Sequence, residues 1–163
     1  MDSPHRAEAL ICVATEAFHD GDTFHCLTAE PTQRRIVVRV AGVDAPETGQ
    51  HFWRVARTKL RQLATQGSTL KCDKADRYQR QVCSVTSPDG RDVGEELLKA
   101  GLAWHFKRYE ADQPPEERNR YRNAEALARR ARLGLWAETD PIAPWDCRAR
   151  RREGYTCREG AAQ

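Results

Sequence analysis

Three β-prone runs follow one another near the start of the chain: ALICVATEAF (9–18), DTFHCLTAE (22–30) and RRIVVRVAGV (34–43). The third run is nearly continuous in β-branched residues, which is typical of a buried strand. Because only short turns separate the runs, consecutive strands are expected to pair with each other as a β-meander. This arrangement restricts the fold to architectures that begin with three neighbouring antiparallel strands.

The period then changes. Apolar residues recur at helical spacing over residues 50–66, and two further strand-like runs follow at 68–74 and 79–86. A short helix after Asp92 and a long basic helix over 116–133 complete the pattern. Five strands with a helix between the third and the fourth predict an α+β fold, a five-stranded Greek-key barrel of the OB type with three α-helices.

The 163 residues are enough for one domain with a real core. We expect this domain to span residues 10–136. The remaining residues, 137–163, contain many turn-forming residues, and we expect a turn-rich extension that a disulfide could staple.

Six cysteines fall into three pairs that are local in sequence. Cys12 and Cys26 straddle the first predicted hairpin, and Cys72 and Cys83 straddle the second. Facing residues of antiparallel strands are close enough for a bridge, so geometry favours both pairs. The pair Cys147–Cys157 rests on proximity alone, and reduced core thiols remain the alternative for all six.

Disulfides would indicate an oxidising compartment, so we expect a periplasmic or secreted protein rather than a cytoplasmic one. The first residues, MDSPHRAEAL, are polar, so an export signal would have to lie outside this sequence. No apolar run approaches the roughly 20 residues of a membrane helix. We expect a monomer without a membrane partner.

The net charge of +3 is small, but its distribution is uneven. Acidic residues gather at 16–30 and 44–47, whereas basic residues crowd 118–132 and 148–158. An acidic pocket on a basic protein suits a cation site beside a bound polyanion. Two solvated faces would explain the same distribution.

Three carboxylates occupy positions that can meet at one end of such a barrel. Asp22 begins the second strand, and Asp44 and Glu47 follow the third. Converging carboxylates repel one another unless a cation holds them, and hard oxygen donors favour Ca²⁺ or Mg²⁺ over zinc. Ordinary turn and capping acids are the alternative.

Two arginines adjoin these carboxylates in the predicted fold. Arg39 lies within an apolar strand, where burying an unpaired charge is costly. It therefore either faces solvent or points at an anion near the carboxylates. Arg80 begins the fifth strand, and guanidinium groups give phosphate fixed, bidentate donors.

Four motifs occur in order along the chain: DGDT (20–23), RVAGVDAPET (39–48), DRYQR (76–80) and LLKAGLAW (97–104). Together they resemble the staphylococcal nuclease (thermonuclease) family, over about residues 10–136. The resemblance implies a calcium-dependent phosphodiesterase, acting as an endo- or exonuclease on DNA and RNA and leaving 3′-phosphate ends.

By position, the resemblance implies that Asp22, Asp44 and the backbone carbonyl of Ala45 bind one Ca²⁺ ion. Glu47 would orient or deprotonate the attacking water. Arg39 and Arg80 would grip the phosphate and stabilise the transition state. Arg80 would act electrostatically, because the pKa of arginine is too high for a general acid.

The resemblance also implies a substrate-binding set of Arg77, Tyr78, Lys107 and Tyr109. This chain departs from the family pattern in several places. Ala45 replaces a threonine, Gln79 replaces a glycine, and Lys107 replaces the first of two tyrosines, so base stacking could move to Phe106. The competing hypothesis is a catalytically weak or inactive OB-fold module that only binds nucleic acid.

Overall fold

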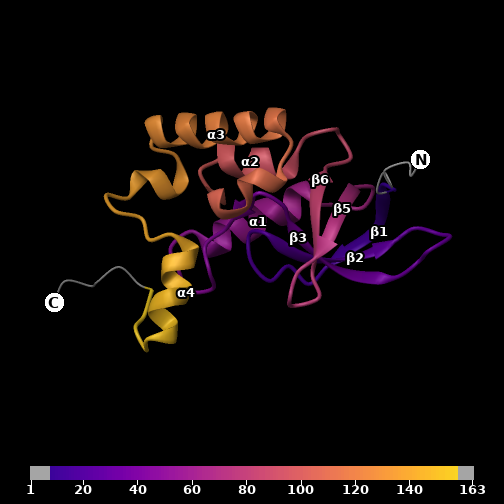
Figure 1. The fold of residues 1–163 in the computed structure, drawn as a ribbon, viewed down its shortest axis with the longest axis horizontal. Helices are drawn as coiled ribbons and strands as arrows, with labels where there is room; N and C mark the ends of the chain where they lie inside the picture. Colours follow the sequence, from indigo (N-terminus) through magenta and orange to yellow (C-terminus); the bar gives the residue numbers. More distant parts are fainter. Residues whose placement is uncertain (1–7, 158–163) are drawn as a thin grey trace.

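The computed structural model describes residues 8–157. Its centre is a closed five-stranded barrel with the strand order β1-β2-β3-β6-β5 (Figure 1). The strands are β1 Leu10–Glu16, β2 Thr23–Thr28, β3 Arg35–Val40, β5 Thr69–Ala75 and β6 Gln81–Thr86. Neighbours are antiparallel except β3 and β6, which run parallel. The barrel confirms the predicted α+β fold of the OB type.

Alternation along the strands decides which side chains fill the barrel. In β3, Ile36, Val38 and Val40 are buried, while Val37 and Arg39 point to the other face. Because side chains alternate across a strand, one apolar set fills the core, and the side chains of the second set are not part of that core. Arg39 belongs to that second set.

Three helices cover the barrel as predicted: α1 Trp53–Leu63, α2 Val93–Lys99 and α3 Pro115–Arg130. Figure 1 shows α3 lying along α2 on one side of the molecule. Helix α1 starts three residues later than expected, because Phe52 before it takes a left-handed conformation with φ of 63°. The remaining short elements are β4 Val43–Asp44, β7 Trp104–His105 and the 3₁₀ turns η1 Lys107–Asp112 and η2 Gly134–Ala137.

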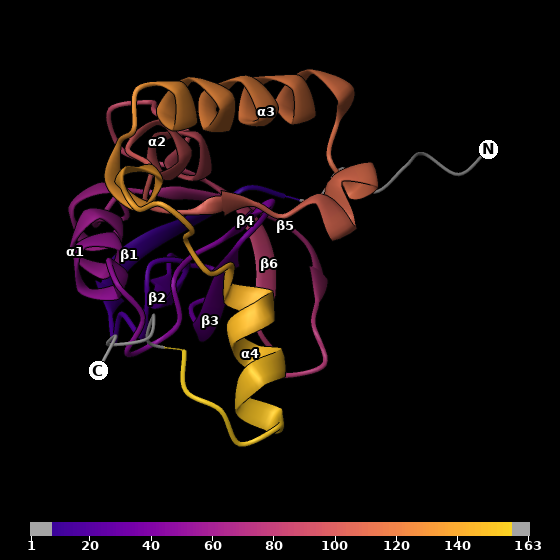
Figure 2. The same cartoon turned by 90° about the vertical axis from the view of Figure 1, so that its left-hand side faces the viewer.

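The turn-rich prediction for residues 137–163 is wrong over part of its length. Residues Pro144–Arg152 form a fourth helix, α4. Proline at the first helical position and four arginines, which are good helix formers, favour this conformation. Figure 2 shows α4 in front of the barrel, away from α3. Residues 158–163 lie outside the described part of the chain.

All six cysteines are joined in pairs, as Cys12–Cys26, Cys72–Cys83 and Cys147–Cys157. Cys72 and Cys83 face each other directly in the β5–β6 ladder, with their Cα atoms 4.0 Å apart. The first two bridges therefore tie strands within the barrel, whereas the third closes α4 onto the segment after it. Within residues 8–157, no helix has both the length and the apolar character to cross a bilayer.

The barrel disulfides should support stability. We expect Cys72→Ser/Cys83→Ser to lower the free energy of unfolding by about 2–4 kcal/mol, because the bridge restricts the unfolded chain. Urea denaturation followed by circular dichroism measures the loss. The comparison variant is Cys147→Ser/Cys157→Ser, whose bridge has a sequence separation of 10 against 11 for the barrel bridge, so both bridges restrict the unfolded chain to a similar extent. A smaller shift of the midpoint for this variant would show that α4 unfolds separately from the barrel. An equal midpoint for the barrel variant and the wild-type protein would contradict the prediction.

Candidate active site

The turn at Asp20–Asp22 brings the start of β2 against two other parts of the chain. A Cβ on Gly21 would lie 2.6 Å from the Cβ of Ala56 and 2.7 Å from the Cβ of Ala45. Only glycine permits so close an approach. As a result Asp22, which is 3% exposed, accepts a 2.7 Å hydrogen bond from the backbone N–H of Ala45 through Oδ2.

Arg39 lies between the two predicted calcium aspartates. Its Nη1 is 3.5 Å from Asp22 Oδ2 and its Nη2 is 3.3 Å from Asp44 Oδ1. The same guanidinium donates to the carbonyls of Val40 and Val43, at 2.8 and 2.7 Å. With its side chain only 11% exposed, Arg39 is not a solvent-facing residue. It holds Asp22 and Asp44 around one spot.

Asp44 is placed there by the small β4–β7 sheet, in which it pairs with Trp104. Glu47 follows in a loop that is closed by two hydrogen bonds with Gln50. The N–H of Glu47 donates to Gln50 Oε1 at 2.7 Å, and the N–H of Gln50 donates to the carbonyl of Glu47. This turn keeps the Glu47 side chain, 24% exposed, at the same end of the barrel as Asp44.

Arg80 reaches this end from the β5–β6 loop. Asp76 accepts hydrogen bonds from the backbone N–H groups of Tyr78 and Arg80 and from Arg80 Nε, so it fixes the loop. Arg80 Nη1 then lies 3.4 Å from the hydroxyl of Thr23, the residue after Asp22. Gln79 takes a left-handed φ of 63°. The chain thus adopts at Gln79 a conformation that favours glycine, the residue the family pattern has there.

The predicted substrate-binding residues form two exposed aromatic and basic groups. Tyr78 is 63% exposed, and the guanidinium of Arg77 lies 4.8 Å from the centre of its ring. Tyr109 is 48% exposed and has Lys74 over its ring. Lys107, by contrast, lies 3.6 Å from the nearly buried carboxylate of Glu125, an ion pair that competes with any phosphate contact.

Sequence reasoning missed two arginines of α4 at the site, Arg148 and Arg151, of which Arg151 Nη1 lies 4.0 Å from Glu47 Oε2. Arg148, from α4, donates to Asp44 Oδ1 at 3.2 Å and Oδ2 at 2.7 Å, and to Glu47 Oε1 at 2.6 Å. The only signal was the basic run over 148–158, which charge alone could not place. Arg148 lies outside all four motifs and is brought in by tertiary packing.

Burial is the main influence on the carboxyl groups at the barrel end. Burial, reinforced by the neighbouring charge of Asp22, raises the pKa of Asp20 to about 8. Burial also raises the pKa of Asp44, although Arg148 and Arg39 oppose it. At Asp22 burial acts in the same direction, but Arg39 and the Ala45 N–H outweigh it and lower the pKa. These carboxylates therefore depend on cations close by.

The donor chemistry fits a hard divalent ion. Asp22 and Asp44 supply carboxylate oxygens. Ala45 follows Asp44 in the chain and is held next to Asp22 by the hydrogen bond from its N–H, so its carbonyl is a further oxygen donor. Within residues 8–157 no three Asp, Glu, His or Cys side chains converge as a ready metal cluster. A site made of two carboxylates and a backbone carbonyl does not require such a cluster. In this structure the acids contact arginines instead, namely Arg39 and Arg148.

Comparison with known proteins identifies the relatives of the chain. The model of the family described as "Staphylococcal nuclease homologue" matches residues 37–138. A protein of Escherichia coli O157:H7 described as an uncharacterized endonuclease is 32% identical over 134 residues, which cover 81% of each chain. An uncharacterized endonuclease of Haemophilus influenzae is 36% identical over 77% of this chain and 66% of its own length.

A plant relative matches in the same way over a smaller share of its length. The staphylococcal-like nuclease CAN1 of Arabidopsis thaliana is 33% identical over 77% of this chain, which is 37% of the plant protein. The range matched by the family model contains Arg39, Asp44, Glu47 and Arg80 but not Asp22 or Arg148. Since the family model covers more than half of the chain, this protein belongs to the staphylococcal nuclease family.

Proposed function

We propose that this protein is a calcium-dependent nuclease that hydrolyses phosphodiester bonds of DNA and RNA and leaves 3′-phosphate ends. One observation carries the proposal. A nearly buried arginine, Arg39, lies between Asp22 and Asp44, with Glu47 and Arg80 at the same end of the barrel. The endonuclease and nuclease names of the relatives support the same class of reaction.

Asp22, Asp44 and the carbonyl of Ala45 would hold one Ca²⁺ ion. When bound, the ion supplies Lewis-acid stabilisation of charge on a phosphate oxygen. The residues of the chain do the rest. Glu47 is exposed enough to accept a hydrogen bond from water and to orient that water toward phosphorus.

Arg39 and Arg80 would bind the non-bridging phosphate oxygens, where negative charge grows in the transition state. Asp76 holds Arg80 Nε, which leaves its terminal nitrogens for the substrate. Water adds to phosphorus, the bond to the 5′-oxygen breaks, and the 5′-oxygen gains a proton. The products are a 3′-phosphate and a 5′-hydroxyl.

A module that only binds nucleic acid explains fewer of these features. Binding needs basic and aromatic groups such as Arg77 and Tyr78, but it gains nothing from buried carboxylates. Burying Asp22 and Asp44 together costs free energy, and binding a metal cation between them would offset that cost. We therefore favour the enzyme over the binding module.

We also propose that the protein acts as a monomer in an oxidising, extracytoplasmic compartment. Every proposed catalytic group comes from a single chain. Three disulfides with no free cysteine in residues 8–157 support the compartment, because such bridges persist where thiols are not kept reduced.

Metal removal tests the cofactor. We expect cleavage of plasmid and single-stranded DNA with Ca²⁺, loss of cleavage with EDTA, and recovery when Ca²⁺ is returned in excess. Mg²⁺ should support less activity, because it demands a tighter octahedral site than flexible oxygen ligands provide. Gel electrophoresis of the digests measures this. Full activity in EDTA would refute the calcium proposal.

Glu47→Gln tests water activation. It keeps the size of the side chain but removes its charge, and we expect the cleavage rate at saturating Ca²⁺ to fall about 100- to 10,000-fold. A fluorogenic oligonucleotide assay measures the rate, with the exposed residue Glu30 as a control in Glu30→Gln. An undiminished rate for Glu47→Gln would remove Glu47 from the mechanism.

Arg80→Ala tests phosphate stabilisation. The expected loss in rate is about 100- to 1,000-fold, since one preorganised donor of transition-state charge disappears. Arg80→Lys should recover only part of it, because lysine lacks the planar fork. The exposed Arg61 supplies the control variant Arg61→Ala. Equal rates for Arg80→Ala and Arg61→Ala would contradict the assignment.

A further inference from the structure

Helix α4 occupies the same end of the barrel as the proposed active site. Arg148 contacts both carboxylate oxygens of Asp44 and one oxygen of Glu47, and its side chain remains 36% exposed. These oxygens belong to the proposed metal and water-activating groups. The Arg148 guanidinium therefore pairs with the carboxylates that a metal ion at this site would need.

The helix is docked by apolar contacts as well. Trp145 stacks on Phe106 with ring centres 5.7 Å apart and meets Trp104 edge-on at 5.4 Å. Ala143, Pro144 and Cys147 are buried. Phe106 is also the aromatic that the sequence suggested as a platform for a base. Trp145 thus covers a surface that a nucleotide would use.

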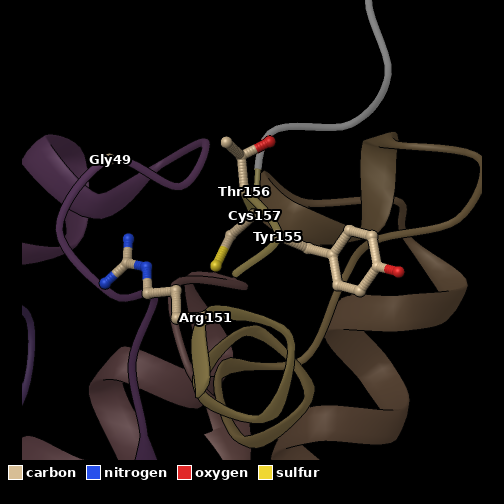
Figure 3. A pocket seen from close by; sticks show the side chains of 5 residues that line it. All are labelled: Gly49, Arg151, Tyr155, Thr156 and Cys157. Atoms are coloured by element: carbon tan, nitrogen blue, oxygen red, sulfur yellow. The ribbon is translucent and has the colours of Figure 1, made fainter. Parts of the chain in front are cut away.

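Further contacts attach α4 to the loop that carries Glu47. Gln50 Nε2 donates to the carbonyl of Ile142 at 3.0 Å, and Arg151 donates to the carbonyl of Thr48. Figure 3 shows Arg151 extending toward the loop at Gly49, in a pocket that Cys157 also lines. The Cys147–Cys157 bridge holds this return segment next to Arg148. The helix is thus fastened on both sides of Arg148.

Arg39 contacts Asp44 through Oδ1, at 3.3 Å, whereas Arg148 lies 2.7 Å from Oδ2. A divalent ion that binds Oδ2 would therefore meet the Arg148 guanidinium at close range, and like charges repel. We propose that α4 is an internal competitor for the metal site. Arg148 holds Asp44 and Glu47 until Ca²⁺ displaces it, and the release of α4 also uncovers Phe106. This inference rests on the proposed function, since it takes Asp22 and Asp44 as calcium ligands.

The arrangement has a quantitative consequence. If only a fraction of molecules have α4 released before calcium binds, the apparent affinity for calcium is reduced by that fraction. Removing Arg148 should remove this competition. The alternative, in which Arg148 is a third phosphate-binding arginine, predicts no gain in calcium affinity when it is removed.

Calcium titration calorimetry of the full chain, without nucleic acid, tests the proposal. We expect Arg148→Ala to bind Ca²⁺ about tenfold more tightly than the wild-type protein. Arg150→Ala removes an equal charge from an exposed position two residues further on, and it should change the affinity less than about twofold. Asp22→Asn should abolish binding in either background. Half-maximal DNA cleavage should need about tenfold less Ca²⁺ in Arg148→Ala.

Hydrogen exchange supplies a readout that does not depend on activity. We expect amides of residues 144–152 in the wild-type protein to exchange faster when Ca²⁺ is added, and those of β2 and β3 to exchange more slowly. Trp145→Ala loosens α4 while keeping every charged group, so it should also bind Ca²⁺ more tightly. It keeps the test available if Arg148→Ala does not fold.

The outcomes separate the two proposals. If neither the wild-type protein nor Arg148→Ala binds Ca²⁺, the proposed function fails and the competition fails with it. If both bind equally well and exchange in α4 does not respond, the calcium site stands and the competition is overturned. Weaker binding by Arg148→Ala also overturns it, and would show that Arg148 positions Asp44 for the metal.

Discussion

The arrangement of the barrel end depends on one buried charge, the guanidinium of Arg39. It comes from the face of β3 opposite the apolar core, and it neutralises Asp22 and Asp44 while donating to two backbone carbonyls. A buried charge without partners would cost several kcal/mol. Arg39 and the two aspartates therefore have to be buried together, because each ion pair offsets the free energy lost when its charges leave water.

Two pieces of backbone outside β3 bring the aspartates into contact with Arg39. The turn at Gly21 approaches Ala45 and Ala56 too closely for any side chain, which sets the position of Asp22. The β4–β7 pairing sets Asp44. Asp22 and Asp44 are therefore positioned by rigid elements, and the loop that carries Glu47 follows Asp44 directly, a placement that favours precise geometry over adaptability.

The contacts of α4 change how such a site would work. In a barrel without this helix, Arg39 would be the one cationic partner that the described residues give Asp44. Here Arg148 gives Asp44 a second cationic partner, and Trp145 adds apolar contact with the segment that leads toward Tyr109. If the site binds metal and nucleic acid as proposed, the docking of this one short helix determines both the charge balance without metal and the access of the substrate.

The sequence was informative wherever local chemistry decides structure. Short β-prone runs predicted the strands, helical spacing and capping residues predicted α1 to α3, and four ordered motifs indicated the family. Local patterns also named Asp22, Asp44 and Glu47 as acids that could meet. Arg39 remained ambiguous, because strand alternation assigns a face but does not say whether that face meets water or an acid.

Helix α4 and Arg148 show where this reasoning ends. Propensity alone is a weak predictor for a nine-residue helix in which five residues are charged, because packing decides such segments. The position of Arg148 depends on the packing of Trp145 against Phe106 and Trp104, which lie about forty residues earlier in the chain. Local sequence established which side chains carry charge. Only long-range packing decided which of those charges meet, because that depends on contacts between residues far apart in the chain.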